Sequence, residues 1–203
     1  MQQPMTSATA LPVYDYQLVI RPPEHVRKRL DTTRNKIVQS LLPPSNWKPG
    51  KNQVPVASFS QYAKNEKKLT DLLHSIASGV PPFLFHVQHY GTALQHTIYF
   101  HMVPNHGFNQ LLQQLHQEKM SMKVVNQEPR FASFPKINVA FKLQPNEMAQ
   151  AWQHVKHKRI SLRFVADNVL LLRKRPDETK WQILASLPFQ NMPVPINQGL
   201  LFA

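Results

Sequence analysis

Apolar and polar residues alternate along several short runs of the chain, which is the pattern of a half-buried β-strand. In the stretch 134–143, FPKINVAFKL, one set of alternating positions is apolar and the other begins with Lys136 and Asn138. This run predicts a strand with a core face and a second face that carries a cation and an amide. Similar runs predict strands over 14–21, 54–60, 83–89, 96–103, 159–165, 169–173 and 181–187.

Between these runs, apolar residues recur at i, i+3, i+4 and i+7, which indicates four amphipathic helices. The first helix follows Pro22 and Pro23, the third follows Pro104, and the fourth has Pro145 in its first turn. Gly79 closes the second helix. Prolines at helix starts and a glycine at a helix end are typical punctuation, so the helix boundaries agree with the periodicity.

The connections are short. We expect a flexible basic loop over 43–52, a link over 90–94 that contains Gly91, and a hairpin turn at 167–168. The order helix, strand, helix, strand, strand occurs twice, with one extra strand at each end. This duplicated unit suggests two similar α+β lobes.

The predicted fold is therefore α+β and bilobal, with two antiparallel sheets that face a central groove and helices on the outside. The strands 54–62 and 134–143 hold equivalent places in the two units. Within the 203 residues, we expect a disordered segment over 1–12, a single bilobal domain over 13–190 and a C-terminal extension over 191–203.

The charge balance narrows the choice of partner. Lysine and arginine number 24 against 11 aspartates and glutamates, a formal net charge of +13. Such an excess favours polyanions such as nucleic acid or nucleotides, although basic residues on solvated helix faces also serve solubility alone. The chain has no cysteine, which excludes disulfides, thiol catalysis and cysteine metal sites. Without a long apolar run or a secretory signal, we expect a cytoplasmic monomer with no membrane partner.

Three stretches resemble the 2H phosphoesterase superfamily, which includes the 2′-5′ RNA ligase-like proteins. They are YDYQLVIRPPEHVRKRL from residue 14, FPKINVAFKLQPNEMAQAWQHVKHKRISLRFVADNVLLLRK from residue 134, and WQILASLPF from residue 181. The resemblance implies that each lobe supplies a His-x-Thr/Ser motif on its inner strand. Two imidazoles then act as general base and general acid at a phosphodiester while the hydroxyls bind phosphate oxygens, and no cofactor is needed.

This chain departs from that pattern in both motifs. Val56 stands where the first histidine is expected and Ser58 keeps the hydroxyl, whereas Lys136 and Asn138 replace the second histidine and its hydroxyl partner. Valine cannot exchange a proton, and lysine is a poor base near neutral pH. Because a positioned acid or base contributes roughly 10²–10⁴ in rate, the resemblance implies a catalytically degenerate member. We expect it to bind an RNA end or nucleotide through Lys136, Asn138, Ser58 and His101.

Two alternatives stay open. The chain is a working phosphodiesterase or RNA ligase-like enzyme if non-family residues such as His101 and Lys136 carry the proton transfers. It is an interaction scaffold if Trp47 or the tail LLFA plugs the groove. Histidines 86, 89, 96 and 101 offer a metal site or a relocated acid/base pair, and the hairpin between them is expected to bring His89 near His96. Four aromatic residues are candidates to stack on bases or to fill the core: Tyr16, Trp47, Tyr99 and Phe131.

Overall fold

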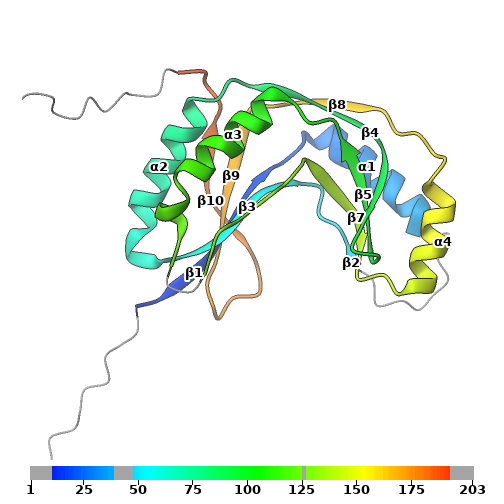
Figure 1. The fold of residues 1–203 in the computed structure, drawn as a ribbon, viewed down its shortest axis with the longest axis horizontal. Helices are drawn as coiled ribbons and strands as arrows, with labels where there is room; N and C mark the ends of the chain where they lie inside the picture. The colour runs from blue at the N-terminus through cyan, green and yellow to red at the C-terminus, as the bar shows by residue number, and fades with distance from the viewer. Residues whose placement is uncertain (1–10, 39–47, 125–126, 193–203) are drawn as a thin grey trace, which may run out of the picture.

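Two antiparallel five-stranded sheets form the framework of the molecule (Figure 1), and residues of both sheets line a cavity between them. The computed structural model describes residues 11–38, 48–124 and 127–192. The predicted α+β bilobal class is confirmed. No helix in these three segments is long and apolar enough to cross a membrane.

The first sheet, sheet A, has the strand order β10-β9-β1-β3-β6. These strands are β10 (Gln182–Pro188), β9 (Asn168–Lys174), β1 (Val13–Ile20), β3 (Val54–Tyr62) and β6 (Arg130–Phe131). Helix α2 (Glu66–Ser78) packs against β9 and β10, and α3 (His106–Gln117) packs against α2. Two 3-10 turns, η1 (Ala63–Asn65) and η2 (Lys119–Met122), precede α2 and follow α3.

The second sheet, sheet B, has the order β2-β7-β5-β4-β8. Its strands are β2 (Lys48–Pro49), β7 (Lys136–Phe141), β5 (Thr97–Met102), β4 (Phe83–Ala93) and β8 (Leu162–Ala166). Helices α1 (Glu24–Val38) and α4 (Pro145–Val155) lie together on its outer side, as Figure 1 shows. The apolar stripes of the helices and the strand faces that the helices cover join in one main core.

The lobes are not the two successive sequence units. Strands β4 and β5 come from the first unit, but they complete sheet B between β7 and β8. The predicted hairpin at 167–168 is wrong, because β8 pairs with β4 whereas β9 pairs with β1 and β10. Only Asp167 separates β8 from β9, so the chain crosses from one sheet to the other there (Figure 1).

The predicted link over 90–94 is also wrong. Strand β4 continues to Ala93, and the turn is made by Leu94 and Gln95, whose φ angles are 53° and 55°. Gly91 lies inside the strand, where a Cβ atom would come within 2.5 Å of the Tyr99 ring. The glycine therefore makes room for an aromatic ring on the neighbouring strand and is not a turn residue.

The ends and the basic loop are described only in part. Of the predicted loop over 43–52, residues 48 and 49 form β2 and pair with β7. Residues 1–10, 39–47 and 193–203 lie outside the described residues, so the disordered start and most of the extension stay predictions. Asn191 and Met192 donate backbone hydrogen bonds to Val80 and Ser78, at 3.2 and 2.8 Å.

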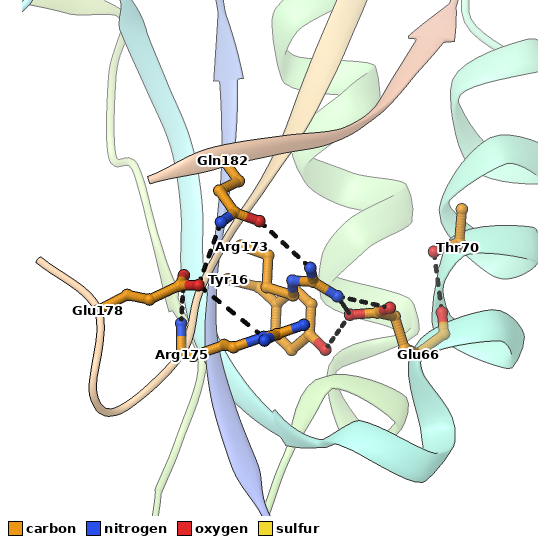
Figure 2. A network of polar contacts seen from close by, with 7 residues as sticks. All are labelled: Tyr16, Glu66, Thr70, Arg173, Arg175, Glu178 and Gln182. Atoms are coloured by element: carbon orange, nitrogen blue, oxygen red, sulfur yellow. Dashed lines mark hydrogen bonds and ion pairs between the residues drawn. The ribbon is translucent and has the colours of Figure 1, made fainter. Parts of the chain in front are cut away.

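A polar network ties the start of α2 to sheet A (Figure 2). The Glu66 carboxylate accepts a hydrogen bond from the Tyr16 hydroxyl at 3.0 Å and forms an ion pair with Arg173 Nη1 at 3.0 Å. Burial first, and then the hydrogen bond to Glu66, raise the pKa of Tyr16 well above its ordinary value. Gln182 accepts from Arg173 at 3.3 Å and so extends the network to β10.

Replacing Glu66 with alanine should destabilise the fold. The change leaves the buried Tyr16 hydroxyl and the half-buried Arg173 guanidinium without their partner, and we expect the free energy of unfolding to fall by about 2 kcal/mol. Urea unfolding measures the difference. Glu24→Ala removes an exposed carboxylate that pairs with Lys28 and should change the free energy by less than about 0.5 kcal/mol. Equal effects of the two substitutions would contradict the anchoring role of the network.

Candidate functional site

A cavity of about 510 Å³ lies between the two sheets. Strands β1, β3 and β6 line it from sheet A, β2 and β7 line it from sheet B, and residues 132–134 close one side. Its volume is in the range of sites that bind small molecules. We call it the first cavity.

Four predicted site residues meet here. Val56 and Ser58 on β3 and Lys136 and Asn138 on β7 all line the first cavity. The groove predicted from the two strands therefore exists, and it brings together a cation, an amide and a hydroxyl. Whether these groups bind a ligand stays a prediction.

A spacing of two predicts that the side chains of Val56 and Ser58 lie on the same face of β3, but in the structure they do not. The β1–β3 register pairs Leu18 with Ala57 and Val19 with Pro55, so Val56 is an extra residue at a β-bulge. Val56 is fully buried and belongs to the core. Because opposite residues share a face, Ser58 lies on the same face as Gln17, which also lines the first cavity.

The ammonium group of Lys136 is held by aromatic rings. Its Nζ lies 4.9 Å from the centre of the Phe134 ring and 5.3 Å from that of Tyr99. Cation–π contacts of this kind hold a charge in place without neutralising it. No carboxylate in the described part of the chain forms an ion pair with Lys136, so its charge is available to an anion.

Two further cations line the first cavity. Arg130 lies opposite Ser58 on β6, and Lys51 follows β2. Neither has a carboxylate partner among the described residues, and no aspartate or glutamate of the described chain lines the cavity. A concave surface with three unneutralised cations attracts anions.

The amide oxygen of Asn138 is buried and has no hydrogen-bond partner in the described structure. An unsatisfied buried polar atom costs about 1–3 kcal/mol. Because Asn138 lines the first cavity, a hydrogen-bonding group of a ligand or a water molecule that reaches this atom would relieve that cost.

The wall beside Asn138 is fixed by a buried arginine. Arg34 on α1 bonds to Asp31 at 2.7 Å, to the Asn52 side chain at 2.5 Å and to the backbone oxygen of Asn138 at 3.3 Å. Burial lowers the pKa of Arg34, and the charge of Asp31 acts against this shift. The segment that contains Asn52 is thereby held against β7.

Gly50 is required at this wall. Its N–H donates to the backbone oxygen of Val139 at 3.0 Å. A Cβ atom at this position would lie 1.8 Å from the backbone oxygen of Asn138. Only glycine allows two backbones to approach so closely, and the approach defines this edge of the first cavity.

His101 does not line the first cavity, although it lies opposite Lys136 on β5. Its ring stacks on His89 with 4.3 Å between ring centres and lies 6.4 Å from Phe134. Burial, and then the charge of His89, lower the pKa of His101. Its ring therefore supports Phe134, which in turn contacts Lys136, and its predicted contact with phosphate stays a prediction.

The other histidines do not gather at one place. His89 lies opposite His101 and not near His96, because the β4–β5 hairpin turns at residues 94–95. His96 bonds to the hydroxyl of Thr97 at 2.9 Å, and His86 bonds to that of Ser161 at 3.4 Å. No group of three or more side chains suited to a metal ion occurs among the described residues.

The candidate stacking residues divide between the core and the groove. Tyr16 is buried and stacks on Phe59, and Tyr99 lies beneath Lys136. Phe131 lines the first cavity, and Trp47 lies outside the described residues. The sequence did not single out Arg130 or Trp181, which also line the cavity. Arg130 lies outside every predicted strand and helix, and Trp181 is the first residue of the predicted strand over 181–187, so alternation alone did not assign either side chain to the cavity.

The chain resembles solved structures in fold, whereas comparisons of its sequence find no related protein. No protein-family model and no curated protein sequence matches the chain. LigT of E. coli in complex with NADP+ is 18% identical, with a TM-score of 0.64 over 88% of this chain and 99% of that chain. TT0787 of Thermus thermophilus is 17% identical, with a TM-score of 0.62 over 87% and 98%. A further structure, described as a phosphoesterase, is 16% identical, with a TM-score of 0.60 over 87% and 98%. The chain therefore has the fold of LigT over nearly its whole length.

The pKa of His101 should be measurable below its ordinary value of 6.5 by NMR titration of the imidazole signals. In the folded state this group binds fewer protons than in the unfolded state, so its effect on stability is constant above about pH 6.5. Stability should then fall as the pH decreases below that value. In His89→Gln, the pKa of His101 should rise but stay below 6.5, because burial remains. A pKa at or above 6.5 in the wild type would contradict this account.

Proposed function

We propose that the chain is a catalytically degenerate 2H phosphoesterase-like protein that binds a phosphate-bearing ligand, a nucleotide or an RNA end, in the first cavity. The main observation behind this proposal is that three cations line the cavity: Lys51, Arg130 and Lys136. None of them forms an ion pair with a carboxylate in the described part of the chain. Charge-assisted hydrogen bonds from such groups are the usual means of holding phosphate oxygens.

The neutral groups of the cavity support the same ligand class. Ser58 and Asn138 lie on facing strands of the two sheets and both line the cavity. A hydroxyl and an amide can bond to the ester oxygens or hydroxyls that flank a phosphate. LigT, which has the same fold, has been crystallised with 3′-AMP and with phosphate, which supports a phosphate-bearing ligand for this chain.

The chemistry of the lining residues supports the proposed degeneracy. Acid–base cleavage of a phosphodiester needs one group that takes up a proton and one that gives it. The described residues that line the first cavity include no histidine, aspartate, glutamate or tyrosine. Binding without turnover is therefore the function that this set of side chains supports. A monomeric state and a cytoplasmic location stay predictions of the sequence.

Lys136→Ala should weaken the binding of 3′-AMP by about tenfold or more, because a charge-assisted contact is lost. The affinity should also depend less on salt concentration than in the wild type, because one screened charge interaction is lost. Isothermal titration calorimetry at several salt concentrations measures both quantities. Lys64→Ala removes an exposed cation of η1 that lines neither this nor any other described cavity, and it should leave the affinity unchanged. An unchanged affinity in Lys136→Ala would overturn the proposed site.

A turnover assay distinguishes the proposed binding protein from the alternative, a working phosphodiesterase. We expect no hydrolysis of adenosine 2′,3′-cyclic monophosphate above the uncatalysed rate, even at high protein concentration, because the described lining lacks an acid–base pair. Chromatography of the reaction products measures the rate. Hydrolysis that disappears in His101→Ala would show that residues outside the family motif carry the reaction and would overturn the degenerate assignment.

A further inference from the structure

A small apolar cluster on sheet A is separate from the main core. It consists of Val19 on β1 and Leu170 and Leu172 on β9, all nearly fully buried. The register places Val19 opposite Leu170 and Gln17 opposite Leu172. Since opposite residues share a face, the cluster lies on the face of sheet A that turns toward the groove, where Gln17 and Val19 line the first cavity.

A single aromatic side chain covers this cluster. Trp181, directly before β10, is half-buried and packs against it. Trp181 also lines the first cavity and an adjoining second cavity of about 670 Å³. Among the described residues it is the one aromatic side chain common to both. We call Trp181 together with Val19, Leu170 and Leu172 the apolar shelf.

The charges differ on the two sides of the shelf. The first cavity has three cations and no described carboxylate. The second cavity shares Arg130 with the first and adds the carboxylates of Asp15 and Glu128. Asp15 pairs with Lys174 at 3.2 Å, and Glu128 pairs with Lys119 at 3.3 Å and with Lys123. Lys51 and Lys136 line the first cavity and not the second, so a phosphate is favoured in the first. An uncharged part of the same ligand is favoured over Trp181, where the carboxylates of the second cavity begin.

We infer that the apolar shelf is the stacking surface for the aromatic base of the ligand, so that the groove takes a nucleotide and not a sugar phosphate or inorganic phosphate. This inference rests on the proposed function, because a phosphate bound in the first cavity would position the attached base over Trp181. An indole ring offers a large rigid face, and stacking on such a face accepts any base. The aliphatic residues of the shelf pack against the indole, and Lys174 Nζ lies 5.7 Å from the centre of its ring, so the plane of the ring is fixed from more than one side.

Three probes separate the base from the phosphate: adenosine, ribose 5-phosphate and AMP. Calorimetry should show that wild-type protein binds AMP more tightly than ribose 5-phosphate, and that it binds adenosine weakly. In Trp181→Leu, which keeps an apolar cover over the cluster, affinity for AMP should fall by about tenfold or more and adenosine binding should be lost. Affinity for ribose 5-phosphate should not change. Trp181→Phe should retain most of the affinity for AMP.

Ile183→Ala serves as the control, because Ile183 is exposed, lies two residues away on β10 and lines neither cavity. It should leave all three affinities unchanged. Equal wild-type affinities for AMP and ribose 5-phosphate, or an equal loss of both in Trp181→Leu, would overturn the stacking surface. Absence of adenosine binding to the wild type would also overturn it.

The two proposals fail in different ways. If ribose 5-phosphate binds and depends on Lys136 while adenosine does not bind, the phosphate site stands and the stacking surface is wrong. If adenosine binds through Trp181 while Lys136→Ala leaves ribose 5-phosphate unaffected, the stacking surface stands and the phosphate site is wrong. Failure of all three probes to bind overturns both proposals.

Discussion

The crossing of the chain at Asp167 is the constraint on which the groove depends. A single residue joins β8 of sheet B to β9 of sheet A, and strands β4 and β5 from the first half of the chain complete the sheet that holds β7. Neither sheet can be completed by one contiguous half of the sequence. Both halves of the chain therefore contribute strands to each sheet, and the chain passes between the two sheets several times. A groove fixed in this way presents its side chains to a ligand with little reorganisation.

Within sheet B, the cation of the site depends on residues two strands away. The register aligns Gly91, Tyr99 and Asn138 in one row across β4, β5 and β7. It aligns His89, His101 and Lys136 two rows along, on the same face. Gly91 leaves the space that the Tyr99 ring fills, and this ring lies beneath the ammonium of Lys136. The stacked histidines support Phe134 on the other side. Lys136, which stands where the second motif histidine is expected, is therefore held by the rings of Tyr99 and Phe134 and is not an isolated replacement.

The sequence predicts the elements well and their partners poorly, for a physical reason. Alternation with a period of two shows which residues share a face, and it correctly placed Lys136 and Asn138 on the groove side of β7. It carries no information about which strand lies alongside, so the predicted hairpin at 167–168 was wrong. Alternation also cannot reveal a β-bulge. The bulge in β3 directs Val56 into the core, whereas Ser58 faces the cavity. Trp181 and Arg130 lie beside turns, and only the completed sheets bring them to the cavity.

The three cations of the first cavity, which have no carboxylate partner in the described part of the chain, also affect the protein when no ligand is bound. Lys51, Arg130 and Lys136 surround one concave space, and their charges repel one another. Mobile anions that accumulate there screen this repulsion, and the screening strengthens with ionic strength. The melting temperature of the free chain is thereby linked to the kind and amount of salt in the solution. Multivalent anions should protect the fold at concentrations at which chloride does not, because they occupy the groove of the native state and have no equivalent place on the unfolded chain.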